Sequence, residues 1–233
     1  MNEYDVRERN GNLKALFSRN WCSLAFITGC VLLLCVAQAA DSVLYQNDFE
    51  KAEVGKIPSD MFVLDGNFSV KSEATNQFLE LPGAPLDSFS IQFGPAETNS
   101  LLVSALIRST AKSRRFPTFG LGLYGVAGFK LQVSPAKQSL ELFKDQTLLA
   151  STAFDWKSGE WTMMQLQARS GASDAWKIEA KAWARGSPEP STWLISADYK
   201  AESALSGRAS VFGSPFSGTP IQFDNLRVEA VKP

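Results

Sequence analysis

The chain of 233 residues contains no histidine, and its three cysteines, Cys22, Cys30 and Cys35, all lie near the amino terminus. Without an imidazole it has no Ser-His-Asp or Cys-His catalytic constellation and no histidine-based zinc motif. Any acid–base chemistry must therefore come from carboxylates, tyrosine, lysine or a bound metal. From residue 41 onward there is no cysteine, so a domain there folds without disulfides, as its size permits.

A strong charge of either sign is also missing. The 23 basic and 24 acidic residues leave a formal net charge of -1. No broad positive field is available to attract nucleic acid, so we expect no nucleic-acid partner. The apolar fraction of 45% is enough for a packed core and argues against disorder.

The first 40 residues have the pattern of an export segment. A basic stretch precedes an apolar run over residues 21–40, which ends in small residues. This pattern predicts a signal peptide, with an uncleaved membrane anchor as the alternative. A third alternative is a lipoprotein, because Ile27-Thr28-Gly29-Cys30 resembles a lipobox. All three predict an extracytoplasmic domain over residues 41–233, which contacts a membrane only through the first segment.

The rest of the chain is composed of short runs of alternating apolar and polar residues, separated by Gly, Pro, Ser and Asp. Such spacing predicts one all-β domain, a two-sheet antiparallel sandwich. The last run, residues 221–228, and the first, residues 43–50, are expected to be neighbours. The predicted strands between them lie at residues 61–64, 67–70, 78–81, 89–93, 100–108, 119–124, 129–134, 140–142, 161–169, 176–183, 192–195 and 209–212.

Several of these runs resemble the concanavalin A-like (LamG-like) jelly rolls. The segments that carry the resemblance are Asp48-Phe49-Glu50, Val54-Gly55-Lys56-Ile57-Pro58, Gly120-Leu121-Gly122-Leu123, Gly128-Phe129-Lys130-Leu131, Ser158-Gly159-Glu160-Trp161 and Phe223-Asp224-Asn225-Leu226-Arg227-Val228. The resemblance covers nearly all of residues 41–233 and implies two curved sheets, often with sugar bound on the concave face. Because these motifs are structural, they support the fold better than any function.

Three carboxylates are candidates for a structural calcium site. Asp48 and Glu50 are expected to share one face of a strand, and Asp224 approaches them if the first and last strands pair. The resemblance implies calcium between terminal strands, and carboxylate oxygens suit that ion. The alternative is that they are solvated acids at strand ends, or that Asp224 caps a turn.

The middle strands offer a candidate sugar-binding face. If Leu121, Leu131, Leu166, Ile178 and Val211 point into the core, the side chains between them point away from it. Amides and charges bond sugar hydroxyls, and aromatic rings stack on C–H surface. The predicted set is Tyr124, Lys130, Gln132, Gln165, Gln167, Glu179, Lys181 and Trp183. The alternative is an ordinary polar sheet face, with Trp183 buried beneath the loop at residues 186–190.

A basic cluster at residues 112–117 includes Arg114 and Arg115. On an exposed loop, two adjacent guanidinium groups suit the sulfate or carboxylate of an acidic polysaccharide. The alternative is a solvated turn.

The sequence gives little indication of catalysis. A glycosidase requires two carboxylates across its substrate, and Glu179 is the only carboxylate of the predicted face. We therefore expect an exported, non-catalytic β-sandwich that binds carbohydrate or an extracytoplasmic protein. A carboxylate-dependent glycoside hydrolase and a structural or interaction protein of the cell envelope remain the alternatives.

Overall fold

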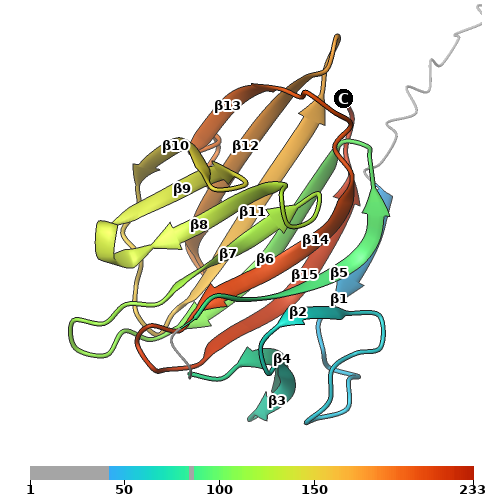
Figure 1. Ribbon diagram of the computed structural model, residues 1–233. Helices are drawn as coiled ribbons and strands as arrows, with labels where there is room; N and C mark the ends of the chain where they lie inside the picture. Colours follow the sequence, from blue (N-terminus) through green and yellow to red (C-terminus); the bar gives the residue numbers. More distant parts are fainter. Residues whose placement is uncertain (1–41, 84–86) are drawn as a thin grey trace, which may run out of the picture. The chain divides into compact units, whose positions relative to one another are not determined.

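The computed structural model describes residues 42–83 and 87–233 (Figure 1). The predicted leader at residues 1–40 lies outside the described residues, so the signal peptide, the anchor and the extracytoplasmic location stay predictions. Across the part of the chain that the structure describes, no helix has both the length and the apolarity to cross a bilayer.

One of the two sheets has eight strands. They are β1 (Ser42–Asn47), β3 (Ser69–Glu73), β4 (Asn76–Leu81), β6 (Leu101–Ser109), β11 (Trp161–Ser170), β12 (Ala175–Ala184), β13 (Ile195–Lys200) and β15 (Ile221–Ala230). The spatial order is β13-β12-β11-β6-β15-β4-β3, and β1 also pairs with β15.

The other sheet has seven strands. They are β2 (Phe62–Asp65), β5 (Phe89–Glu97), β7 (Thr118–Leu123), β8 (Phe129–Ser134), β9 (Ser139–Lys144), β10 (Thr147–Ala153) and β14 (Gly207–Ser214). Their order is β10-β9-β8-β7-β14-β5-β2, and a 3-10 turn, η1 (Pro135–Lys137), joins β8 to β9. Neighbouring strands in both sheets run antiparallel, which confirms the predicted two-sheet antiparallel sandwich.

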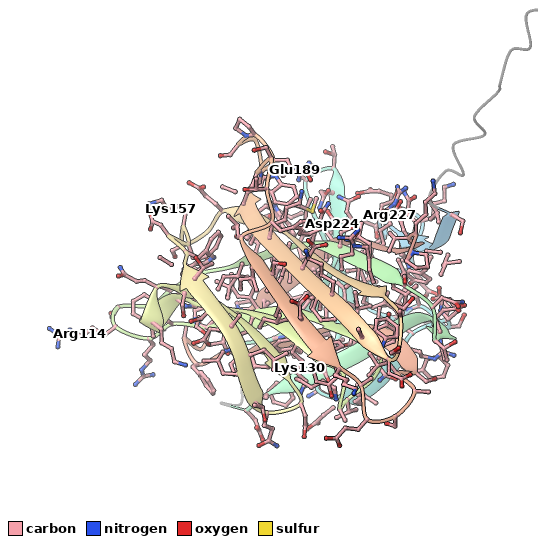
Figure 2. The ribbon with its side chains drawn as sticks, turned by 90° about the horizontal axis from the view of Figure 1, so that it is seen from above. Arg114, Lys130, Lys157, Glu189, Asp224 and Arg227 are labelled. Atoms are coloured by element: carbon pink, nitrogen blue, oxygen red, sulfur yellow. The ribbon has the colours of Figure 1, made fainter. Side chains whose placement is uncertain are left out.

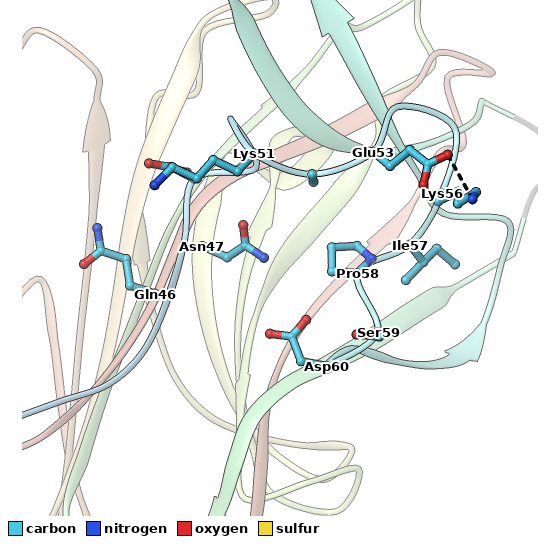
Figure 3. A pocket seen from close by; sticks show the side chains of 11 residues that line it. Gln46, Asn47, Lys51, Glu53, Lys56, Ile57, Pro58, Ser59 and Asp60 are labelled. Atoms are coloured by element: carbon cyan, nitrogen blue, oxygen red, sulfur yellow. Dashed lines mark ion pairs between the residues drawn. The ribbon is translucent and has the colours of Figure 1, made fainter.

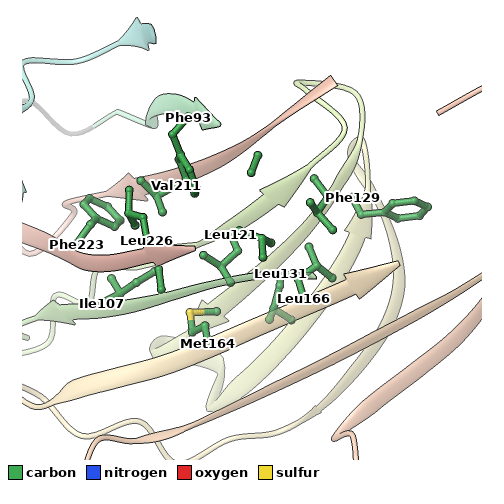
Figure 4. Close-up of a cluster of buried hydrophobic side chains, with 14 of the residues drawn as sticks. Phe93, Ile107, Leu121, Phe129, Leu131, Met164, Leu166, Val211, Phe223 and Leu226 are labelled. Atoms are coloured by element: carbon green, nitrogen blue, oxygen red, sulfur yellow. The ribbon is translucent and has the colours of Figure 1, made fainter. Parts of the chain in front are cut away.

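The core lies between the two sheets and is built from the inward side chains of both (Figure 4). All five predicted core residues, Leu121, Leu131, Leu166, Ile178 and Val211, are fully buried. They do not come from one sheet. Leu121, Leu131 and Val211 belong to the seven-stranded sheet, whereas Leu166 and Ile178 belong to the eight-stranded sheet. The outward side chains next to these two groups consequently lie on opposite sides of the sandwich.

The first and last strands pair as predicted. β1 runs antiparallel to β15 from the pair Ser42–Ala230 to the pair Asn47–Leu226. Along this edge, the beginning of β15 pairs with β4 and the rest of it pairs with β1. The ladder of β15 with β6 is irregular after Asp224, and Asn225 there has a φ of 49°.

Two elements differ from the predicted runs. The strand expected at residues 192–195 begins at Ile195 and continues to Lys200. β10 has no counterpart among the predictions, because its sequence TLLASTA places two leucines side by side and lacks a clear alternation.

Candidate functional site

A pocket of about 270 Å³ lies over the outer face of the seven-stranded sheet. We call it the sheet groove. Its lining comes from strands β2, β5, β8 and β14 and from the turn between β7 and β8. The lining residues are Leu64, Ser88, Phe89, Ser90, Gln92, Gly125, Val126, Lys130, Gln132, Ser210, Phe212 and Ser214.

Strand register arranges the centre of the groove in two rows. Residues directly opposite each other on neighbouring strands share one face of a sheet. The first row, read across β5, β14, β7 and β8, is Gln92, Ser210, Gly122 and Lys130. The second row is Ser90, Phe212, Gly120 and Gln132. Each row therefore has a glycine where β7 crosses it.

The two glycines leave the middle of this face without side chains. A Cβ on Gly120 would lie 2.8 Å from the Phe212 ring atom Cζ, and one on Gly122 would collide with the Ser210 hydroxyl. The ring of Phe212 and the hydroxyl of Ser210 thus occupy space that only glycine leaves open. Phe212 is partly exposed, so the groove presents an aromatic surface beside polar groups.

The polar groups of the groove are mainly uncharged. The hydroxyls of Ser88 and Ser214 share a hydrogen bond of 2.6 Å. Gln132 donates its side-chain amide to Ser134 Oγ at 2.8 Å, which leaves its carbonyl oxygen as an acceptor. Lys130 is half-buried and forms no salt bridge with any described residue.

A buried carboxylate, Glu141 of β9, lies directly opposite Gln132 on the neighbouring strand. It accepts hydrogen bonds from Ser134 Oγ at 2.6 Å and from Lys137 Nζ at 2.9 Å. Burial alone would raise the pKa of Glu141, but the bonds from Ser134 and Lys137 and the Lys137 charge lower it below its ordinary value. Glu141 is therefore an anion at neutral pH, paired with Lys137 and absent from the groove lining.

Lys130 and Gln132 are the two predicted site residues that line the groove. Tyr124, by contrast, does not point away from the core. β7 ends at Leu123, and Tyr124 adopts a left-handed backbone with a φ of 61°, which breaks the strand alternation. Its ring packs edge-on against Trp176 with the centroids 5.5 Å apart, and its hydroxyl donates to the carbonyl of Asn99 at 2.7 Å. Tyr124 is only 4% exposed and packs with the core residues, and this burial raises the pKa of its hydroxyl.

The other five members of the predicted face lie on the opposite side of the molecule. They are Gln165, Gln167, Glu179, Lys181 and Trp183, all from β11 and β12. The prediction of one continuous face was wrong, because these strands belong to the eight-stranded sheet. Glu179 is only 5% exposed, and it accepts hydrogen bonds from Arg169 at 2.7 Å and from Gln167 at 3.1 Å.

The side chain of Lys181 lies against two tryptophan rings of that face, Trp183 and Trp193. Its ammonium lies 5.7 Å from the Trp183 ring centroid and 4.7 Å from that of Trp193. It also pairs with Glu189 of the neighbouring loop. The Trp183 ring is partly buried, and the ammonium of Lys181 already lies over it.

Arg114 and Arg115 lie in a small hairpin turn within the connection between β6 and β7, two strands that belong to different sheets. The tip is closed by backbone hydrogen bonds of 3.0 Å in both directions between Lys112 and Arg115, and both arginines are exposed. Figure 2 shows Arg114 projecting from the body of the domain. Neither arginine is part of the groove lining, and their binding of an anion stays a prediction.

The predicted calcium ligands do not form a cluster. Within residues 42–83 and 87–233, no group of three or more acidic side chains is placed to hold a metal. β1 ends at Asn47, whose side chain accepts a hydrogen bond from Phe49 N, so Asp48 and Glu50 lie in a turn rather than on one strand face.

The oxygens of these carboxylates have other partners. Glu50 Oε1 accepts from Gln77 N at 3.0 Å. Asp224 is 1% exposed and accepts from Asn76 at 3.2 Å and from Asn225 N at 2.6 Å. Burial raises the pKa of Asp224, which favours its neutral form. The three residues do not fit a calcium site.

Asp48 instead lines a second pocket, of about 630 Å³, formed by the connection from β1 to β2 (Figure 3). Asn47 and Asp60 also line it. At its rim, Glu53 pairs with Lys56 at 2.9 Å, but both side chains are largely exposed. Solvent screens such a pair, and the pocket contains no set of buried polar groups that would define a ligand.

No protein-family model matches the chain, and no curated protein matches it either. Several solved structures, however, have a similar fold. The carbohydrate-binding module CBM66 from Bacillus subtilis is 10% identical with a TM-score of 0.52, and the match covers 73% of this chain and 96% of that chain. The potassium-bound carbohydrate recognition domain of Emp46p is 12% identical with a TM-score of 0.54, covering 80% of this chain and 95% of that one.

A third similar structure is xylan β-1,4-xylosidase from Bacillus halodurans C-125, with 11% identity and a TM-score of 0.52. The match covers 79% of this chain but 38% of the xylosidase chain. At these identities the likeness concerns the fold. It confirms the predicted concanavalin A-like jelly-roll sandwich.

Ten of the twelve groove residues were missing from the predicted site, among them the outward residues of two strands: Ser90, Gln92, Ser210 and Phe212. A signal for these four is present, because they alternate with core residues such as Ile91 and Val211. The alternation shows that these side chains point outward. Their position beside Lys130 depends on β14 lying between β5 and β7, which no local pattern indicates.

Proposed function

We propose that the protein is an extracytoplasmic, carbohydrate-binding β-sandwich and that the sheet groove is its sugar site. The observation that carries the proposal is the groove lining. Hydroxyl and amide groups line the groove beside a partly exposed phenylalanine ring. Two glycines of β7 leave room for that ring and for the Ser210 hydroxyl. Hydroxyls and amides bond sugar hydroxyls, and the ring offers an apolar surface for sugar C–H groups.

The apolar rim of the groove suits the same ligand. Leu64 of β2 is 48% exposed and Val126 of the β7–β8 turn is 61% exposed, and both line the groove. A sugar ring has apolar faces and polar edges, so it can contact this rim while its hydroxyls reach the serines and glutamines below. The carbohydrate-binding module and the recognition domain with similar folds support the proposal by analogy.

The groove favours binding over hydrolysis. None of its lining residues is Asp or Glu, whereas a glycosidase needs two carboxylates flanking the scissile bond. Glu179, the carboxylate of the predicted face, lies on the other sheet and is bonded to Arg169. The proposal assigns no metal and no catalytic residue to the groove.

Affinity electrophoresis of the full chain in gels containing soluble polysaccharides, together with pull-downs on insoluble ones, tests this function. The informative variant is Phe212→Ala, with Trp183→Ala on the opposite face as the matched control. Loss of one aromatic stacking contact, about 0.5–1.5 kcal/mol, weakens binding by about twofold to tenfold. Melting temperatures confirm that both variants fold.

The expected result is retarded migration on at least one polysaccharide, reduced by Phe212→Ala and unchanged by Trp183→Ala. The groove is refuted as the site if Trp183→Ala reduces the retardation and Phe212→Ala does not. The function itself is refuted if the wild type binds none of a broad panel of acidic and neutral glycans.

A further inference from the structure

We propose that the sheet groove selects acidic sugars and that Lys130 binds their carboxylate or sulfate group. This inference rests on the proposed function and names the substrate class of the same site. It depends on the charges in and around the groove, rather than on the exposed arginines at the hairpin tip.

Among the described residues that line the groove, Lys130 alone is charged. It is half-buried, and the described residues offer it no salt-bridge partner. Among other partly buried cations, Lys181 pairs with Glu189 and Arg108 with Glu73. Arg208 and Lys144 have no carboxylate partner among the described residues, but each donates a hydrogen bond to a backbone carbonyl. An unpaired ammonium beside a pocket is a ready partner for an anionic ligand.

Glu141, a carboxylate on the same face, does not neutralise Lys130. Gln132 follows Lys130 on the same face of β8, and Glu141 lies directly opposite Gln132 on β9. Glu141 already accepts hydrogen bonds from Ser134 and Lys137, and its charge is balanced by Lys137. The groove therefore keeps one net positive charge.

The position of Lys130 also suits a sugar that carries one anionic group. Lys130 and Ser210 lie in the same row on either side of Gly122, two strand spacings or about 10 Å apart. Gly122 has no side chain, so the Ser210 hydroxyl extends over β7 toward Lys130, and a ligand can contact both groups. Its hydroxyls then reach Ser210 and Gln92 while an acidic substituent reaches the ammonium.

Matched polysaccharide pairs test the inference on the full chain. Each pair shares a backbone and differs in charge: polygalacturonate with its methyl ester, and dextran sulfate with dextran. The first pair probes a carboxylate and the second a sulfate. Dissociation constants are measured at low and high salt for the wild type, for Lys130→Gln, and for an Arg114→Gln/Arg115→Gln double variant.

The wild type is expected to bind the acidic member of at least one pair more tightly, by about tenfold to a hundredfold for a charge-assisted hydrogen bond. Lys130→Gln should remove this preference, so that the two members of a pair bind the variant with similar affinity. Added salt should weaken binding of the acidic member to the wild type. The double variant should behave like the wild type.

Other outcomes overturn the inference and are distinguishable from failure of the function. If the wild type binds both members of a pair equally and Phe212→Ala weakens both, the groove binds sugar without charge selection. If the preference survives Lys130→Gln and disappears in the double variant, the hairpin tip supplies the charge. If no member of either pair binds to any variant, the acidic-sugar inference is wrong, and the broader glycan panel decides the function.

Discussion

Replacing Gly122 by alanine should weaken sugar binding strongly while the domain remains folded. Gly122 faces outward on β7, between Ser210 and Lys130. The new methyl group would meet the Ser210 hydroxyl, which is the end of a short side chain that can rotate. The fold can therefore accommodate the change by turning Ser210, but the middle of the groove is then filled and its hydroxyl is displaced.

The two effects have different expected sizes. Adding one carbon to a packed site costs about 1–3 kcal/mol, which lowers the melting temperature of a domain of this size by about 2–12 °C. Loss of the Ser210 hydrogen bond to a ligand costs about 1 kcal/mol, and steric exclusion of the ligand adds to it. We expect the affinity to fall by at least about tenfold.

Two other glycines give matched controls. Gly159 has a φ of 84° and open space around it, so Gly159→Ala should cost about 1–2 kcal/mol through backbone strain alone and leave binding intact. In Gly120→Ala the methyl group would collide with the Leu131 carbonyl. Backbone cannot rotate away as a serine side chain can, so that variant should lose more stability than Gly122→Ala.

Isothermal titration with the best polysaccharide of the panel, together with thermal melts, checks all three variants. The reasoning is refuted if Gly122→Ala melts within the expected range and binds as tightly as the wild type, because a ligand over β7 cannot tolerate that methyl group. It is also refuted if Gly159→Ala weakens binding equally, since the loss would then follow stability rather than groove shape.

Two further predictions concern buried carboxylates. Burial raises the pKa of Asp224, so the folded state loses stability as pH rises from the unfolded-state pKa through the higher folded pKa. Urea unfolding should show Asp224→Asn more stable than the wild type at pH 7, with the difference shrinking at pH 3; a constant difference would contradict this. The pKa of Glu141 is lowered, so its stabilisation is present above the unfolded-state pKa and is lost as pH falls through the folded pKa. Glu141→Gln should cost about 1–2 kcal/mol at pH 7 and almost nothing in acid, and an equal cost at both pH values would show that shape, not charge, matters there.

The sandwich itself was predictable because its signals are local. Alternation of apolar and polar residues identifies a half-buried strand wherever it occurs, and Gly, Pro and Asp mark the turns. The five predicted core positions are buried for this reason. Pairing of β1 with β15 was also predicted, from the similarity of two short segments at the two ends of the domain.

The candidate site was predictable only in part, because alternation shows which side of a strand faces the core and not which sheet contains the strand. Leu131 and Leu166 both point inward. Their outward neighbours, Lys130 and Gln165, nevertheless lie on opposite faces of the molecule. The prediction that Tyr124 points outward was wrong for a different reason. Its positive φ ends the alternation of β7 and directs the ring into the core.

The groove depends most strongly on one long-range register. Phe212 faces Gly120, and Ser210 faces Gly122, because β14 pairs with β7 in the register that sets Val211 opposite Leu121. A slip of one residue would turn Val211 toward solvent and Phe212 toward the core. Val211 and Leu121 are both fully buried, so the burial that stabilises the sandwich also fixes the register and thereby forms the groove. Core variants that preserve the register, such as Val211→Ile, should therefore alter stability while leaving the binding preference unchanged.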